Sequence, residues 1–259
     1  MTSIPFFQVD AFAVGPLTGN PAAVMPLDSW LDDDTMQKIA AENNLSETAF
    51  TVASDGDEFD YELRWFTPTV EVALCGHATL AAGHVLISGG RARFATRSGI
   101  LTVSRRDDLL ELDLPAFPVE RGDVAGLDDA LGVTGETFVS RGGNGAAIVL
   151  LPDEQAVRAV EPDFPRLRTI DALVIVTAPG DRHDIASRVF AAYHGIDEDP
   201  VTGSAHAALT PFWADRLGRD RFTALQASKR TGLLHCRLDG DRVILGGRCA
   251  TVIVGNFQL

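Results

Sequence analysis

The amino-acid sequence predicts an α+β fold made of two similar halves. Strand and helix signals alternate along the chain with no low-complexity linker, short motifs recur in the same order, and each half contains one long helix suited to a core. The chain has 259 residues, of which 46% are hydrophobic and 22% are charged. This composition is typical of a globular protein with one large or two modest domains.

An internal repeat is the main evidence for two halves. The matching segments are 19–24 and 143–148, 75–78 and 202–205, and 98–112 and 231–245. A strand–helix–strand arrangement common to many proteins, with similar glycine turns, could produce one such match by itself. Three matches in the same order, with slowly growing offsets, favour a duplicated domain. Prolines at 115 and 118 place the hinge there, which predicts domains 1–117 and 118–259, with the last strand able to cross back to the first.

The first half should contain two opening strands, a polar helix, two more strands, an apolar helix and closing hairpin strands. The polar helix is predicted over residues 33–43, with Met36, Ile39 and Ala40 as its buried stripe. Acidic residues at its start suit the helix dipole. Asn43-Asn44 would end it in a left-handed turn.

The second helix of each half is expected to lie in the core. Residues 76–88 are apolar on every face, which predicts a helix buried inside a wrapped sheet. Its counterpart is predicted over residues 203–217, where Pro211 should bend it. The residues of this counterpart that we expect to face the core are Leu209, Phe212, Trp213 and Leu217.

The charge balance excludes several classes of partner. A net charge of −14, from 22 basic and 36 acidic residues, argues against nucleic acid and anionic membranes, because little here would neutralise phosphates. No window approaches the roughly 18 apolar residues of a membrane span. No signal peptide is recognisable, and three scattered cysteines do not form a disulfide framework. We therefore expect a cytoplasmic protein.

Both core helices begin at a glycine turn, Cys75-Gly76-His77 in one half and Thr202-Gly203-Ser204 in the other. A helix start offers unpaired N–H groups and partial positive charge, which attract anions. Two ordinary glycine turns are the simpler interpretation. If the repeat brings the two starts together, they could hold a carboxylate or an enolate oxygen.

Three ionisable residues are candidates for acid/base chemistry. Glu47 lies between the polar helix and a strand, and by itself it would be interpreted as a solvated loop charge. His77 is at a helix start, where the dipole disfavours its cation, although a buried histidine bonded to a carbonyl is the alternative. Asp199 precedes the other core helix, and capping would explain it equally well.

Six motifs add a family resemblance. They are VDAF at 9–12, GNPAAV at 19–24, LSETAF at 45–50, RWFTP at 64–68, Glu71 followed by CGHAT at 75–79, and DPVTGSAH at 199–206. In this order they resemble the phenazine-biosynthesis PhzF-like family, from residue 4 to the end of the chain. The resemblance implies the fold of diaminopimelate epimerase, in which two pseudo-symmetric domains each wrap a curled, mostly antiparallel sheet around a central helix. It also implies a site in the cleft between the domains, cofactor-independent isomerase chemistry and a homodimer.

The resemblance also assigns residues. The family's catalytic glutamate falls on Glu47, its active-site histidine on His77 and its aspartate on Asp199. The contacts to the substrate carboxylate fall on Gly76, Gly203 and Ser204, and Asn20 is expected to bind substrate as well. Segment 69–74 matches the family loosely, so it would bear on substrate choice.

These assignments predict a proton shift on a small carboxylic acid. Glu47 would take a proton from one carbon and return it to another, giving either an isomerisation of the 1,5 type or an epimerisation. His77 and Asp199 would relay protons or orient the substrate. The resemblance implies that no cofactor is needed. No metal is expected either, because Cys75, His77 and His206 lack a metal-ligand spacing.

Two other functions remain open. A racemase that uses two cysteines would place thiolates at both helix starts, but Thr202 stands where Cys75 would be matched. A small-carboxylate-binding protein on the same fold would keep the pocket without turnover.

Overall fold

The computed structural model describes residues 2–140 and 145–259. By its internal contacts the chain divides into two compact units, Met1–Asp113 with Gly246–Leu259, and Leu114–Leu245. The boundary predicted after residue 117 falls a few residues inside the second unit. Residues 143 and 144, part of the repeated glycine motif, lie outside the described residues.

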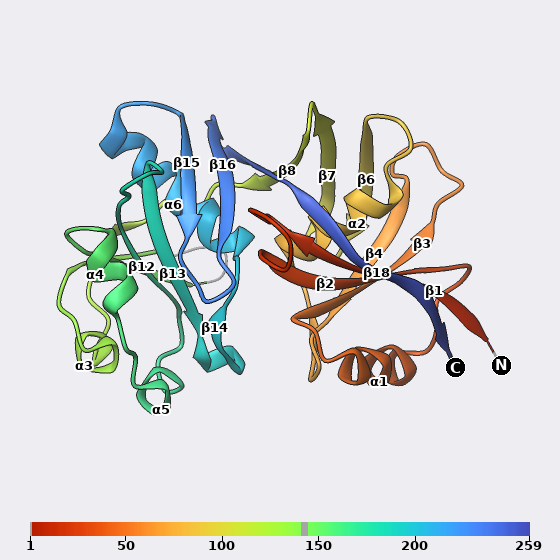
Figure 1. Ribbon diagram of the computed structural model, residues 1–259, viewed down its shortest axis with the longest axis horizontal. Coiled ribbons are helices and arrows are strands. Elements are labelled where there is room, and N and C mark those ends of the chain that lie inside the picture. The colour runs from red at the N-terminus through yellow and green to blue at the C-terminus, as the bar shows by residue number, and fades with distance from the viewer. Residues whose placement is uncertain (1, 141–144) are drawn as a thin grey trace. The chain divides into compact units, whose positions relative to one another are not determined.

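The first unit is a curled sheet around one helix (Figure 1). Its elements are β1 (Ser3–Ala11), β2 (Asn20–Leu27), α1 (Asp33–Asn43), β3 (Glu47–Ala53), β4 (Tyr61–Phe66), β5 (Glu71–Val72), α2 (Gly76–Leu86), β6 (Arg91–Thr96), β7 (Gly99–Arg106), β8 (Leu109–Pro115, which continues into the second unit) and β18 (Cys249–Gln258). Strand β2 is parallel to β3 and β4 is parallel to β6, whereas the pairs β18–β1, β1–β2, β3–β4, β6–β7 and β7–β8 are antiparallel.

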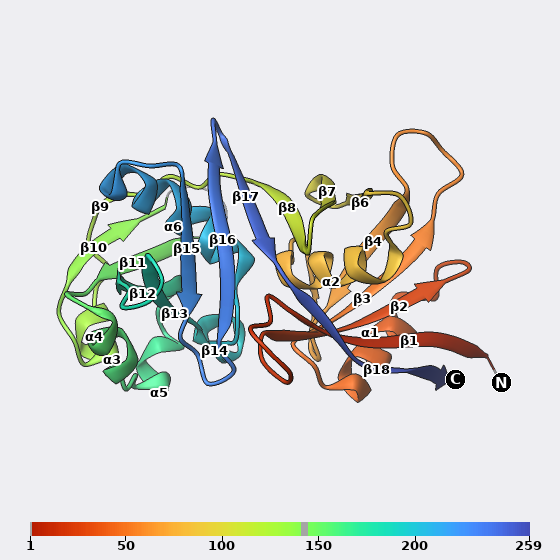
Figure 2. The same ribbon diagram turned by 45° about the horizontal axis from the view of Figure 1, so that its top comes forward.

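The chain ends of the first unit meet at one edge of this sheet. Strand β18 pairs with β1 from Ser3↔Gln258 to Ala11↔Cys249, so the last strand lies with the first unit. Thr2 and Leu259 exchange both backbone hydrogen bonds. The two termini therefore lie side by side (Figure 2).

Helix α2 lies inside the curl of the sheet and contacts β1, β2, β3, β6, β7 and β18. Its first eight residues are buried, as the all-round apolar pattern predicts, while its last turn is half-buried and it ends at Leu86 instead of Ser88. Gly83 permits the close approach to β7, since a Cβ there would lie 2.6 Å from Val103 Cγ1. The central helix is thus held tightly by the sheet.

Helix α1 has the predicted bounds and buries Met36, Ile39 and Ala40. Asn44 ends it with φ 47° and ψ 37°, the left-handed turn expected from the sequence. The following turn delivers the chain directly to Glu47 at the start of β3.

The second unit repeats this topology. Its elements are β9 (Glu120–Arg121), α3 (Leu127–Leu131), β10 (Glu136–Val139), β11 (Ala146–Leu150), α4 (Glu154–Ala159), α5 (Phe164–Leu167), β12 (Leu173–Pro179), β13 (Ile185–Ala191), the 3₁₀ turn η1 (Ala192–His194), β14 (Ile196–Asp199), α6 (Gly203–Leu217), β15 (Arg221–Gln226), β16 (Gly232–Asp239) and β17 (Arg242–Gly247, which reaches the first unit). Strands β11–β12 and β13–β15 are parallel, as β2–β3 and β4–β6 are.

The core helix of this unit, α6, also has the predicted bounds. Leu209, Phe212 and Trp213 are buried, whereas Leu217 is only half-buried because the helix ends at the surface with Gly218. In place of the single long helix α1, the short helices α3, α4 and α5 cover β11 and β12 with a separate apolar cluster (Figure 1). No helix in residues 2–140 or 145–259 is long and apolar enough to cross a membrane.

Candidate active site

Glu47 is the first residue of β3 and is 8% exposed. It pairs in register with Ala22 of the parallel strand β2, next to fully buried Ala49 and Phe50. Strand β3 begins directly after the turn that closes α1, and the carboxylate of its first residue lies in the interior of the unit and not in the solvent. The interpretation of Glu47 as a solvated loop charge is therefore wrong.

His77 is the second residue of α2 and is 4% exposed. Cys75 precedes the helix in an extended conformation, and no side chain in the described part of the chain caps this helix start. The N–H groups of the first turn, including that of Gly76, thus keep the partial positive charge that attracts an anion.

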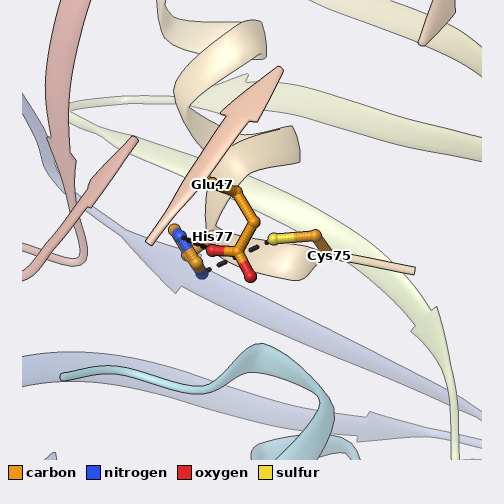
Figure 3. A group of neighbouring side chains, drawn as sticks. All are labelled: Glu47, Cys75 and His77. Atoms are coloured by element: carbon orange, nitrogen blue, oxygen red, sulfur yellow. Dashed lines mark hydrogen bonds and ion pairs between the residues drawn. The ribbon is translucent and has the colours of Figure 1, made fainter. Parts of the chain in front are cut away.

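Glu47, His77 and Cys75 form one buried cluster (Figure 3). His77 Nε2 lies 2.9 Å from Glu47 Oε2, and Cys75 Sγ lies 3.6 Å from His77 Nδ1. Nε2 and Oε2 are at ion-pair distance, and neither atom has any other hydrogen-bond partner among the described residues. Because a carboxylate oxygen has more than one lone pair, Oε2 can also accept a proton from a substrate.

The charges of the cluster act on one another. Burial disfavours the imidazolium, but the groups beside the ring, Cys75 and Glu47, outweigh burial and favour a pKa of His77 well above its ordinary value of 6.5. Burial, assisted by the carboxylate of Glu47, also raises the pKa of Cys75. Cys75 is therefore a neutral thiol near pH 7. The expectation that the helix dipole alone keeps His77 neutral neglected this carboxylate.

Asn20, at the start of β2, completes the cluster and is fully buried. Its Nδ2 lies 3.1 Å from His77 Nδ1, and its Oδ1 accepts a hydrogen bond of 2.9 Å from Ser46 Oγ. Asn20 had been expected to bind substrate. Its amide instead contacts the histidine, and the role of substrate ligand stays a prediction.

In the second unit, the start of α6 carries the other predicted site residues. Gly203 is buried and Ser204 is half-buried. Asp199, 9% exposed, accepts a hydrogen bond from the hydroxyl of Thr202, the residue before the helix. This contact resembles the capping role considered for Asp199, although it reaches the helix through Thr202 rather than through a backbone N–H.

Sequence reasoning missed a residue here. Gln226, fully buried at the end of β15, accepts from the N–H of Thr202 through Oε1 and donates through Nε2 to the carbonyl of Asp199. It therefore fixes the chain just before α6. A glutamine ending an apolar strand carries no recognisable signal, since its role depends on which loop the fold brings beside it.

The predicted site residues therefore fall into two groups. Asn20, Glu47, Gly76 and His77 belong to the first unit, and Asp199, Gly203 and Ser204 belong to the second. Cys75 also belongs to the first group, because its Sγ directly contacts His77. From the sequence, a role for Cys75 is expected only if the protein is a cysteine racemase.

Comparisons with known proteins identify the family. A family model described as "Phenazine biosynthesis-like protein" (PhzC-PhzF) matches residues 9–255. The chain belongs to this family. Over 263 residues it is 50% identical to an uncharacterised isomerase of Pseudomonas aeruginosa, and the match covers 99% of both chains.

Solved structures agree with this assignment. A PhzF-family protein of Enterococcus faecalis is 42% identical, with a TM-score of 0.92 over 100% of both chains. A hydroxyproline epimerase of Agrobacterium vitis is 11% identical, with a TM-score of 0.58 over 98% of this chain and 92% of the other, and it shares the fold. The predictions of the PhzF-like family, the epimerase-like α+β fold and an isomerase are confirmed.

The cluster also has the donor atoms of a metal site. Glu47, Cys75 and His77 each offer one ligand atom, and these atoms lie within 4.8 Å of one another. Oxygen, sulfur and nitrogen are donors that zinc accepts. The third donor beside Cys75 and His77 is Glu47 and not His206, so the absence of a metal requirement stays a prediction.

Proposed function

We propose that this isomerase shifts a proton on a small carboxylic acid without a cofactor and that Glu47 is its general acid/base. The observation that carries the proposal is a buried carboxylate whose Oε2 has no hydrogen-bond partner among the described residues other than the ring nitrogen of His77, beside an uncapped helix start. A carboxylate in such a position has a free lone pair for a substrate proton. The adjacent N–H groups offer a place for substrate oxygen.

In the proposed reaction, an oxygen of the substrate accepts hydrogen bonds from the first turn of α2 at Gly76 and His77. Glu47 removes a proton from a neighbouring carbon, and the electron pair left behind is delocalised toward the bound oxygen. The protonated Glu47 then delivers a proton to another position, and this is a solvent proton whenever the carboxyl group has exchanged with water before delivery. Substrate and product have the same atoms, and the carboxylate of Glu47 is regenerated.

His77 would orient Glu47 or the substrate through Nε2, which lies 2.9 Å from Oε2. Asp199, Gly203 and Ser204 keep their expected roles as proposals, each tested by its own substitution. Two features speak against the cysteine racemase. Burial raises the pKa of Cys75, and Thr202 occupies the equivalent place before α6.

The proposal is tested by incubating the protein in deuterated water with small unsaturated and hydroxy carboxylates, followed by NMR of the substrate carbons. We expect deuterium at a single carbon of one substrate class, with Glu47→Gln abolishing incorporation while the carboxylate still binds. Binding with neither incorporation nor conversion of the carboxylate in the wild-type protein would favour the carboxylate-binding function instead. Incorporation that persists in Glu47→Gln would remove Glu47 from the mechanism.

We also propose that the protein works in the cytoplasm as a homodimer, as the family resemblance implies. Light scattering coupled to size-exclusion chromatography measures the oligomeric state directly. A mass near 27.7 kDa, that of a single chain, would contradict the dimer.

A further inference from the structure

The amide of Asn20 bridges Ser46 and His77 in the interior of the first unit. Asn20 is 0% exposed, so its side chain is surrounded by protein on all sides. Its Oδ1 accepts from Ser46 Oγ at 2.9 Å, and its Nδ2 lies 3.1 Å from Nδ1 of His77. Four side chains thus form a continuous line from Ser46 through Asn20 and His77 to Glu47.

The direction of the bond between Asn20 and His77 determines where the ring proton lies. An amide nitrogen has only hydrogens to offer, so the facing Nδ1 must present its lone pair. A neutral imidazole with a bare Nδ1 carries its single proton on Nε2. Nε2 is the atom that lies 2.9 Å from Glu47 Oε2. The amide orientation therefore places the proton of His77 next to the proposed base.

The charges around the ring favour the imidazolium, in which both ring nitrogens carry a proton. The groups that contact His77 are Asn20 from β2, Glu47 from β3 and Cys75 at the start of α2. The carboxylate of Glu47 favours a second proton on the ring. That proton would go to Nδ1 and would meet the N–H of the Asn20 amide, donor against donor. The imidazolium thus requires the amide to turn over, so that Oδ1 faces the ring and Nδ2 takes the place of Oδ1 beside Ser46 Oγ.

We propose that Asn20, held by Ser46, is a positioning residue that keeps Nδ1 of His77 unprotonated, so that the only ring proton faces Glu47. An imidazolium beside Glu47 would bind the carboxylate as an ion pair and weaken it as a base. A neutral ring leaves the carboxylate able to accept a substrate proton. The consequence for catalysis rests on the proposed function, whereas the protonation state of the ring does not.

The first test is ¹⁵N NMR of protein labelled at the histidine rings, with the His77 signals assigned by their loss in His77→Gln. We expect Nδ1 of wild-type His77 to show the shift of an unprotonated nitrogen and Nε2 that of a protonated one at about pH 7. A protonated Nδ1 in the wild-type protein would overturn the proposal. This measurement requires no substrate, so it stands even if Glu47 is not the base.

The second test is Asn20→Asp, which has nearly the same shape but replaces the donor with an acceptor. We expect both ring nitrogens to be protonated at about pH 7, and kcat to fall about tenfold or more with KM little changed. Asn256→Asp, at an exposed position of β18, is the matched control and should leave both unchanged. Unchanged ring shifts in Asn20→Asp would contradict the proposal.

Ser46→Ala separates positioning from simple packing. It leaves Asn20 and His77 in place and removes only the hydroxyl that holds Oδ1. We expect the titration of His77 to move toward higher pH, in the same direction as in Asn20→Asp but by less, and Ser46→Thr, which keeps the hydroxyl, to restore it. If Asn20→Asp fails to fold, the wild-type spectrum and the Ser46 pair still decide the question, and a titration unchanged in Ser46→Ala would count against it.

Discussion

The starts of helices α2 and α6 show how a duplicated framework has diverged. Each begins at a glycine after an extended residue, and no described side chain caps either one. In each helix a side chain four residues after the capping position bonds to that position's carbonyl, Thr79 to Cys75 and His206 to Thr202. The backbone arrangement that attracts an anion is therefore common to both units.

The surroundings of the two helix starts differ. At α2, Glu47, Cys75 and His77 are titratable groups in mutual contact, and two of their buried atoms lack a described hydrogen-bond partner. At α6, Asp199 accepts from Thr202 and Gln226 bonds to the chain around them, and the atom left without a described partner, Nε2 of His206, has no carboxylate or thiol bonded to it. Both units thus have the backbone arrangement that attracts an anion. The cluster of contacting titratable side chains, Glu47, Cys75 and His77, lies in the first unit.

The largest expected effect comes from removing the proton carrier at α2. Glu47→Gln keeps the shape of the side chain but cannot accept a proton, so substrate deuterium exchange should fall by about 10²–10⁴-fold. The thermal midpoint should change little. Glu42→Gln, at an exposed position of α1, is the control and should exchange at the wild-type rate. Exchange at the wild-type rate in Glu47→Gln would show that the start of α2 does not carry the proton through Glu47.

His206, in the first turn of α6, should make the stability of the protein depend on pH. Burial lowers the pKa of His206 to about 4. Between about pH 6.5 and pH 4, His206 binds a proton in the unfolded chain but stays neutral in the folded chain. Stability from this site is therefore complete above about pH 6.5 and is lost as the pH falls, by a few kcal/mol in total.

Urea denaturation at pH 7 and pH 5 measures this effect in the wild-type protein and in His206→Gln. We expect the wild-type protein to lose more stability than the variant between the two pH values. Equal losses would show that residue 206 does not titrate in this way.

A smaller effect is expected at the start of α6. Asp199→Asn should lower kcat by about tenfold if its charge acts on the reaction. Thr202→Val removes the hydroxyl that Asp199 accepts from and serves as the comparison. A similar loss in both variants would indicate that Asp199 only anchors the chain before α6, and a loss confined to Asp199→Asn would support its predicted role.

The smallest effect should follow the loss of the thiol. Because burial raises the pKa of Cys75, it is a poor nucleophile and base near pH 7, and Cys75→Ser should change kcat by less than about threefold. Steady-state kinetics with Cys249→Ser as the control measures this. Complete inactivity of folded Cys75→Ser would support the cysteine-racemase function instead.

The elements were largely predictable where one local rule dominates. The bounds of α1 and α6 follow from apolar spacing and from the Asn and Gly residues at their ends. The burial of α2 follows from its apolar faces. The short helices α3, α4 and α5 were not predicted in place of one helix, because segments of four to six residues carry too little periodicity to detect.

The sequence by itself determined the duplication, the two glycine helix starts and the family, since these depend on residue order and local backbone preference. Only the tertiary structure decided that Glu47 is buried, that Asn20 contacts His77 and not solvent, and that Gln226 holds the chain before α6. Each of these contacts joins residues from different strands or helices. Which side chains meet depends on strand register and packing, and these in turn depend on the whole sheet.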